Sequence, residues 1–279
     1  MSAQDKTAST LTIKSIVRMS SGFTIPAIGL GVYKNNDPQP ACLAALAHGY
    51  RHIDSAQMYR NEKQVGEAVR DSGVPRSEVF LTSKINQLDG GYNGTLEAID
   101  DSLKNFGTEY LDLYLIHSPI AGKEKRLAAW KALLATRDAK KLRTDSGVKH
   151  LEEIHAAGLE TPAVNQIELH PLCQQRDIVG WCRKNGVVVE AYAPLIRGNF
   201  SNPALQEISK KYERDPAQVL VRWSLQHGFV ALPKSSNPDR VQSNAQVYDL
   251  ELSKEDMEEL DAQDKGKEGS ITWNPVDVD

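Results

Sequence analysis

Short apolar segments alternate with longer amphipathic segments along the whole chain, and this pattern constrains the fold more than any other feature. We predict strands in the short apolar runs at 27–32, 52–54, 79–83, 111–117, 163–167, 187–192 and 230–232. The run at 111–117 is nearly continuously apolar, which is typical of a strand buried on both faces of a parallel sheet. Strands that alternate with helices favour parallel pairing through right-handed crossovers.

The segments between these strands have the apolar spacing of helices. We predict helices near 40–48, 62–71, 95–105, 125–140, 174–184, 204–212, 216–227 and 238–248. A (β/α)8 barrel commonly needs about 250 residues, so a chain of 279 residues fits one such domain over residues 1–279. A small hairpin is predicted at 12–25, ahead of the barrel, with Ser20-Ser21-Gly22 at its centre.

One strand of the expected eight has no good candidate. Between the helix that ends near Lys141 and the helix that starts near Val148, only Leu142-Arg143-Thr144-Asp145-Ser146-Gly147 is available. This segment is short and polar for a buried strand. We therefore expect a barrel with an incomplete or missing fifth strand.

Composition and charge narrow the possible partners and location. A formal charge of −4 gives no general reason to expect nucleic acid or an anionic membrane as partner. The three cysteines share no CxxC spacing, which favours a reducing compartment. No apolar run approaches the roughly 20 residues that span a bilayer, and residues 1–10 lack the apolar stretch of a secretory signal. We expect a cytoplasmic monomer.

Four residues that are costly to bury fall at or just after predicted strand ends: Asp54, Tyr59, Lys84 and His117. Each alone has an ordinary explanation, since a strand-end aspartate often caps a helix and a lone tyrosine usually packs. In a closed parallel barrel, however, the carboxyl ends of all strands meet at one rim, where catalytic groups gather. Four such positions together predict a catalytic site.

The chemistry of these four side chains suits carbonyl reduction, which needs a hydride at carbon and a proton at oxygen. A tyrosine has a pKa of about 10, and a neighbouring lysine is expected to lower it by favouring the phenolate. An aspartate beside the lysine keeps that lysine charged and oriented. A histidine on the other side of the oxygen can polarise the carbonyl.

These residues lie in segments that together resemble the aldo-keto reductase superfamily over nearly the whole chain. The matching segments are GLGVY at 29–33, HIDSAQMY at 52–59, LTSK at 81–84, LDLYLIH at 111–117, PAVNQIE at 162–168, AYAPL at 191–195 and LPKS at 232–235. The resemblance implies a reductase of small aldehydes or ketones, with Tyr59 as general acid. It also implies that Lys84 and Asp54 tune Tyr59, and that His117 orients the carbonyl.

The resemblance further implies a nicotinamide cofactor. The residues implied to bind it are Gln166, Tyr192, Leu195, Lys234, Ser235, Arg240 and Asn244. Lys234, Ser235 and Arg240 match the group that holds the adenosine 2′-phosphate, which favours NADPH over NADH, because an arginine fork clamps a phosphate. The chain has no GxGxxG motif of the Rossmann type, so barrel loops would hold the cofactor. Tyr33 and Trp273 are expected to line the substrate pocket, and no metal is expected.

The sequence departs from the family at the fifth strand. Relatives carry a Gly-Val-Ser-Asn-type motif there, whose last two residues touch the nicotinamide carboxamide, whereas here Thr144 runs directly into Asp145. A true deletion, a splicing or gene-model error, and residues lost from this chain all explain the gap. It leaves open an alternative function, a catalytically impaired barrel that still binds the cofactor. A metal-dependent hydrolase that uses His117, Glu168 and His170 is a further alternative, although their spacing matches no metal-ligand motif.

Overall fold

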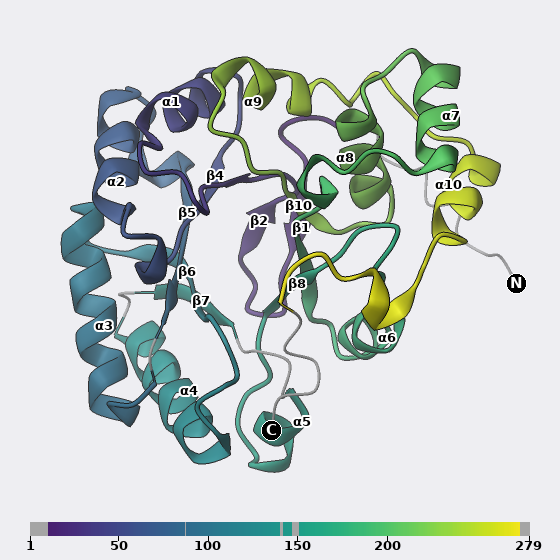
Figure 1. Ribbon diagram of the computed structural model, residues 1–279. Coiled ribbons are helices and arrows are strands. Elements are labelled where there is room, and N and C mark those ends of the chain that lie inside the picture. The colour runs from purple at the N-terminus through teal and green to yellow at the C-terminus, as the bar shows by residue number, and fades with distance from the viewer. Residues whose placement is uncertain (1–10, 87, 140–141, 147–150, 274–279) are drawn as a thin grey trace, which may run out of the picture.

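Eight parallel strands form one sheet that is surrounded by helices (Figure 1). The computed structural model describes residues 11–86, 88–139, 142–146 and 151–273, with 142–146 described as backbone. The strands follow one another around the sheet in chain order. They are β3 (Leu30–Gly31), β4 (His52–Asp54), β5 (Phe80–Ile85), β6 (Leu111–Ile116), β7 (Leu142–Ser146), β8 (Val164–Glu168), β9 (Val188–Tyr192) and β10 (Val230–Leu232).

The last strand meets the first, so the sheet closes on itself. Parallel bridges join Ile28 to Ala231 and Gly31 to Lys234. The amide of Gly29 donates to the carbonyl of Ala231 over 2.9 Å, beside these bridges. The predicted (β/α)8 barrel is therefore confirmed, and its strand ends form two opposite rims.

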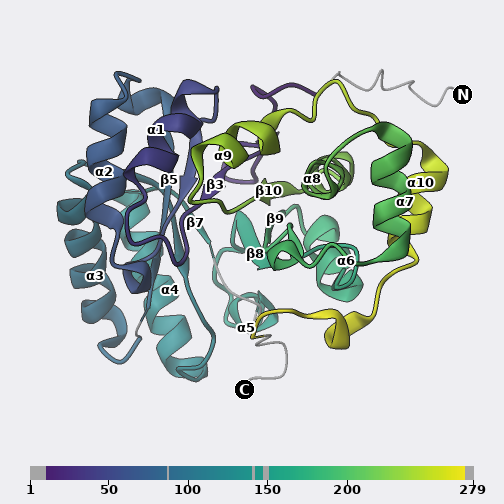
Figure 2. The ribbon, with the colours of Figure 1, turned by 45° about the horizontal axis from the view of Figure 1, so that its top comes forward.

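The helices lie outside the barrel, as Figures 1 and 2 show. Proline occupies the start of several of them, where its fixed φ suits the first turn and its missing N–H is not needed. The helices are α1 (Gln39–Ala47), α2 (Glu62–Asp71), α3 (Gly91–Phe106), α4 (Lys123–Asp138), α5 (Leu151–Ala156), α6 (Arg176–Lys184), α7 (Pro203–Tyr212), α8 (Pro216–Gln226), α9 (Pro238–Ala245) and α10 (Lys254–Asp261). Short 3-10 helices are η1 (Gln57–Tyr59), η2 (Arg76–Glu78), η3 (Ile196–Gly198) and η4 (Gly266–Gly269).

The predicted N-terminal hairpin is present and covers one end of the barrel. It consists of β1 (Ile16–Arg18) and β2 (Thr24–Pro26), which pair antiparallel. Ile25 is fully buried in a cluster with Val164, Val188 and Val230, which are the first residues of their strands. The hairpin thus closes the amino-terminal rim, and the carboxyl-terminal rim is the one left for chemistry.

The fifth strand, expected to be missing or incomplete, exists as β7. Its residues pair with β6 from Leu111↔Leu142 to Leu115↔Ser146, although it pairs with β8 only through Ser146↔Val164. A fifth strand is therefore present, because ladder hydrogen bonds come from the backbone and do not require apolar side chains, and its sparse pairing with β8 agrees with the expectation of an incomplete strand. The predicted start of the next helix near Val148 lies outside the described residues.

The cysteines form no disulfide, as their spacing predicts. Cys42, Cys173 and Cys182 are all free and buried. Burial raises the pKa of the Cys42 thiol to about 12, which leaves it protonated and unreactive. Among the described residues, no helix combines the length and apolar character that crossing a membrane requires.

Candidate active site

The four predicted catalytic residues meet at the carboxyl-terminal rim of the barrel. Asp54 is the last residue of β4, and Tyr59 ends η1 a few residues later. Lys84 lies near the end of β5, and His117 directly follows β6. Because β4, β5 and β6 are neighbours in the sheet, their ends converge on one place.

A buried ion pair lies at the base of this cluster. The Lys84 ammonium donates to both carboxylate oxygens of Asp54, over 2.6 and 2.7 Å, and to the carbonyl of Ser55 over 2.8 Å. All three ammonium protons therefore have acceptors inside the protein. Burial lowers the pKa of Lys84, but Asp54 and Tyr59 raise it by more, so the ammonium stays charged.

The Tyr59 ring is held between aromatic neighbours above the Lys84 ammonium. Its centroid lies 5.0 Å from that of Tyr33, 5.5 Å from that of His117 and 5.2 Å from the Lys84 nitrogen. Burial raises the pKa of Tyr59, and the charge and hydrogen bond of Lys84 only partly oppose it. The expected lowering of this pKa by Lys84 is present, but desolvation of the phenolate outweighs it, so the net pKa of Tyr59 lies above its usual value.

His117 is neutral in this site. Burial and the charge of Lys84 lower its pKa to about 3, so the imidazole is uncharged near neutral pH. Its Nδ1 atom is buried and has no hydrogen-bond partner among the described residues. A neutral imidazole has one N–H donor, so it can direct a single donated hydrogen bond to a ligand.

A second buried polar layer lies inside the barrel, beneath the ion pair. The side-chain amide of Gln166 donates to Asp54 over 2.9 Å and to Glu190 over 3.0 Å. His52 lies 3.7 Å from Glu190 and hydrogen-bonds Thr82. Sequence reasoning missed Glu190 as part of the site, although a glutamate within the apolar run that forms β9 was a signal that could have identified it.

Of the predicted nicotinamide-binding residues, Gln166 on β8 belongs to this layer, whereas Tyr192 and Leu195 lie at the end of β9 and in the loop that follows it. Tyr192 is the last residue of β9, and its hydroxyl lies 3.3 Å from the hydroxyl of Thr272 in the C-terminal segment. The loop after it carries Leu195 between Ala193 and Ile196, which both have positive φ values, 52° and 42°. Non-glycine residues in this region cost about 1–3 kcal/mol each and concentrate at ligand-binding loops.

The predicted phosphate-binding residues follow β10. Lys234 lies just after that strand and Arg240 lies on α9, with Ser235 and Asn244 buried beside them. Burial and the charge of Arg240 lower the pKa of Lys234, so the two cations repel each other. In the described part of the chain neither of them forms an ion pair with a carboxylate, and an anion between them would relieve this repulsion.

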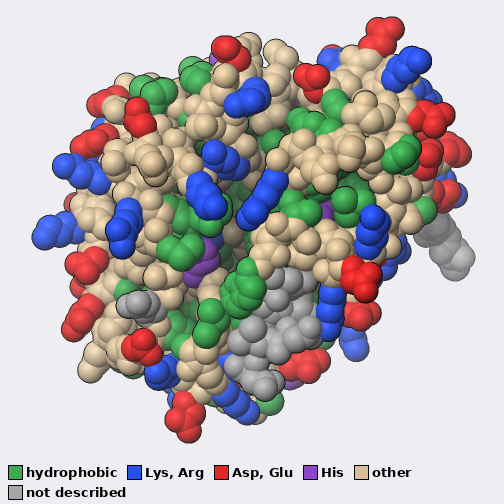
Figure 3. All heavy atoms as spheres, in the orientation of Figure 1, with side chains coloured by type: hydrophobic (Ala, Val, Ile, Leu, Met, Phe, Trp, Pro, Cys, Tyr) green, Lys and Arg blue, Asp and Glu red, His purple; other side chains and the backbone are tan. Residues whose placement is uncertain are grey.

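The predicted substrate-pocket residues are exposed at the same rim. Tyr33 follows β3 and is 41% exposed, and Trp273 ends the described C-terminal segment and is 56% exposed. Figure 3 shows a hollow on this face, with Lys and Arg side chains along its edge and hydrophobic side chains and a histidine within it. The structure thus brings together all of the predicted catalytic residues, with the predicted pocket residue Tyr33 beside Tyr59.

The alternative metal site has no support in the geometry. Glu168 and His170 contact each other at 2.9 Å, and Glu168 accepts its other hydrogen bonds from the C-terminal segment. Among the described residues, no group of three or more His, Cys, Asp or Glu side chains is placed to hold a metal ion.

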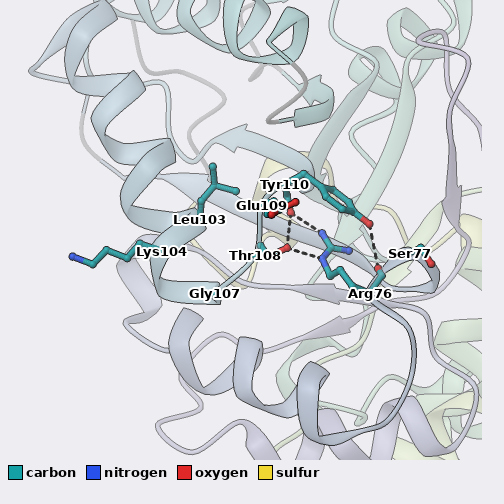
Figure 4. Close-up of a pocket in the computed structure, with 8 residues that line it drawn as sticks. All are labelled: Arg76, Ser77, Leu103, Lys104, Gly107, Thr108, Glu109 and Tyr110. Atoms are coloured by element: carbon teal, nitrogen blue, oxygen red, sulfur yellow. Dashed lines mark hydrogen bonds between the residues drawn. The ribbon is translucent and has the colours of Figure 1, made fainter.

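A groove at the other end of the barrel is built around a guanidinium that hydrogen-bonds within the protein (Figure 4). Its main polar group, the guanidinium of Arg76, donates to Thr108, to the carbonyls of Val79 and Tyr110, and to Asp112. These residues precede β5 and β6, so the groove lies at the amino-terminal rim, away from Tyr59. The guanidinium of Arg76 thus holds these loops together.

The fold and the site together define a barrel enzyme, with an ammonium–carboxylate pair, a phenol and a neutral imidazole at the carboxyl-terminal rim, where barrel enzymes carry their catalytic groups. The sequence profile of the aldo/keto reductase family matches residues 27–265. The chain belongs to this family.

Proteins similar to this chain agree with that membership. The 9,11-endoperoxide prostaglandin H2 reductase of Trypanosoma cruzi is 42% identical over 263 residues, which are 90% of this chain and 92% of that protein. The glyoxal reductase of Bacillus subtilis (strain 168) is 41% identical over 261 residues, 91% of this chain and 94% of that one.

Solved structures give the same result. The aldo-keto reductase MGS-M4, from a Medee basin deep-sea metagenome library, has a TM-score of 0.90 at 37% identity, over 95% of this chain and all of that one. A variant of Gox0644 in complex with NADPH has a TM-score of 0.87 at 34% identity, over 95% of this chain and 99% of that one.

Proposed function

We propose that this chain reduces aldehydes or ketones to alcohols with NADPH, and that Tyr59 donates the proton to the substrate oxygen. The observation that carries the proposal is the convergence of Tyr59, Lys84, Asp54 and His117 at one rim of the barrel. Relatives whose names describe the reduction of glyoxal and of a prostaglandin endoperoxide support an oxidoreductase with a small-molecule substrate.

Tyr59 acts as the acid in this proposal. Its hydroxyl stays protonated at neutral pH because burial raises its pKa. A product alkoxide is a much stronger base, since a water-like hydroxyl has a pKa of about 15.7, so proton transfer from the phenol is favourable. The Lys84 ammonium, held by Asp54, stabilises the phenolate that remains.

His117 and the cofactor residues have positioning roles. The neutral imidazole of His117 directs one hydrogen bond to the carbonyl oxygen. When bound, NADPH supplies the hydride for the carbonyl carbon. Tyr192, Gln166 and Leu195 would hold its nicotinamide end, Lys234, Ser235 and Arg240 would hold its 2′-phosphate, and Asn244 would contact its adenine. The free cations fit this group, and the NADPH complex of the similar Gox0644 variant supports the choice.

The test is NADPH oxidation, followed by absorbance, with glyoxal and with a reactive aromatic aldehyde as substrates. Turnover that depends on Tyr59 is the expected result. NADPH binding, measured by calorimetry, without turnover of any carbonyl would contradict the proposal.

One observation favours the second candidate, a cofactor-binding barrel with impaired chemistry. β7 pairs with β8 through a single residue pair, so the wall of the site is least well held where relatives contact the carboxamide. Binding without turnover is the result this candidate predicts. The intact mass of the protein expressed from its natural gene would show whether residues are absent between Thr144 and Asp145.

We also infer that the protein works as a cytoplasmic monomer without a nucleic-acid partner. The inference rests on the charge, the cysteine pattern and the small-molecule site. Size-exclusion chromatography with light scattering tests the oligomeric state, and a dimer mass would contradict it.

A further inference from the structure

A single carboxylate ties the C-terminal segment to the mouth of the barrel. Glu168, the last residue of β8, is only 1% exposed. Its Oε1 accepts from the amide of Ile271 over 2.6 Å, and its Oε2 accepts from the hydroxyl of Ser270 over 2.7 Å. Oε2 also accepts from the amide of Thr272 over 3.2 Å and from the hydroxyl of the same residue.

The part of the C-terminal segment that precedes this anchor is also held, by contacts with the loop after β8. The amide of Lys265 donates to the carbonyl of Leu172 over 2.9 Å, and Gln174 donates its amide to Asp264 over 3.1 Å. A side chain at Gly269 would overlap the backbone of Leu172, so the segment packs directly against the loop after β8. Figure 2 shows this segment passing α6 on its way toward α5.

The anchoring carboxylate, Glu168, is ionised at neutral pH. Burial alone would raise the pKa of Glu168, but hydrogen bonds from His170, Thr272, Ile271 and Ser270 lower it to about 2. Charge-assisted hydrogen bonds are stronger than neutral ones, so the loss of this charge should loosen the whole segment.

The anchored segment reaches the cofactor side of the site. The hydroxyl of Thr272 lies 3.3 Å from that of Tyr192, one of the residues proposed to hold the nicotinamide. We propose that Glu168 is a positioning residue that holds 270–272 at the barrel mouth and, through Thr272, orients the ring of Tyr192. The effect on the cofactor rests on the proposed function, whereas the anchoring of the segment does not.

The anchoring can be tested without any activity measurement. Trypsin can cut after Lys265 and Lys267, which are exposed in this segment. Glu168→Gln replaces the carboxylate by an amide. Its NH2 group faces hydrogen-bond donors of the segment and cannot accept from them. The loss of one charge-assisted bond worth about 1.4 kcal/mol makes cleavage about tenfold faster. Glu207→Gln, the same change at an exposed site on α7, is the control and should leave cleavage unchanged.

A cycle of variants separates anchoring from a general loss of folding. Ser270→Ala with Thr272→Val removes partners of Glu168 from the segment itself and should also speed cleavage. Glu168→Gln added to that pair should have less effect than it has alone, because the groups act together. Equal effects in both backgrounds, or wild-type cleavage in Glu168→Gln, would overturn the anchoring.

The proposed effect of Glu168 on the cofactor is tested with NADPH as the probe. Glu168→Gln should raise KM for NADPH several-fold with a smaller change in kcat. Tyr192→Phe, which removes the link to Thr272, should reproduce this split without faster cleavage. Faster cleavage with unchanged NADPH affinity would overturn the link to Tyr192. If the wild-type chain itself does not use NADPH, the proposed function fails, while the cleavage result still decides the anchoring.

Discussion

The ammonium nitrogen of Lys84 lies 2.6 Å from one carboxylate oxygen of Asp54 and 2.7 Å from the other, and both side chains are almost fully buried. Neither charge can be hydrated, so each is tolerable only because the other is present. The same pair supports the barrel rim and sets the electrostatic environment of Tyr59. Under the proposed function, stability and catalysis would therefore depend on one contact, and they can be separated experimentally.

Lys84→Met should lower the free energy of unfolding by about 3–5 kcal/mol, because the Asp54 carboxylate is left buried without its cation. The double variant Lys84→Met/Asp54→Asn removes both charges and should recover part of that stability, yet it should stay inactive. Urea unfolding monitored by circular dichroism measures the first effect, and turnover measures the second. Lys104→Met on the exposed face of α3 is the control, and a double variant less stable than Lys84→Met alone would contradict the argument.

Tyr59→Phe should lower kcat/KM by about 10²–10⁴-fold, since it removes the general acid and leaves the ring packing with Tyr33 and His117 in place. NADPH binding, measured by calorimetry, should change little. The matched control is Tyr92→Phe, because Tyr92 is 40% exposed at the start of α3. A Tyr59→Phe enzyme with near wild-type turnover would assign the proton to another donor.

Arg240→Ala should weaken NADPH much more than NADH. One charge-assisted phosphate contact contributes about 1.5–3 kcal/mol, so KM for NADPH should rise about tenfold or more while KM for NADH hardly moves. Lys254→Ala on α10, whose side chain is 82% exposed, controls for the loss of a surface cation. Equal losses for both cofactors would mean that Arg240 does not contact the 2′-phosphate.

Glu190 should make the protein less stable as pH rises. Burial and the charge of Asp54 raise its pKa well above the ordinary value of about 4.3, against smaller opposing effects of Gln166 and Lys84. The folded state therefore holds a proton that the unfolded state releases. The stabilisation is complete below pH 4.3 and is lost progressively as pH rises through the raised pKa.

Urea unfolding of wild type and Glu190→Gln between pH 5 and 9 tests this dependence. The glutamine cannot titrate, so the stability of wild type relative to the variant should decline with rising pH. His52, which faces Glu190 at 3.7 Å, has a folded-state pKa lowered to about 3 by burial, so its titration near pH 6.5 occurs in the unfolded state and adds the same slope to wild type and variant. Glu207→Gln should keep the wild-type slope, and a Glu190→Gln profile with that same slope would assign the dependence elsewhere.

The strands at 52–54 and 230–232 have the predicted bounds, and the other predicted strands differ from the structure by a few residues at their ends. These elements could be predicted because apolar periodicity is local. The convergence of Asp54, Lys84 and His117 could be predicted as well, since parallel β/α topology sends every strand end to the same rim.

Other features depend on contacts between distant segments. β7 forms because its backbone pairs with β6, which its polar sequence did not suggest. The net pKa of Tyr59 depends on burial, which a sequence pattern does not measure. Glu190 meets Gln166, and Glu168 meets Thr272, across separations of 24 and 104 residues. The sequence by itself determined the parallel barrel and the residue types at its mouth, because both follow from local patterns. Only tertiary packing decided which buried groups hydrogen-bond each other and which segment is held over the site, because these contacts join residues far apart in the chain.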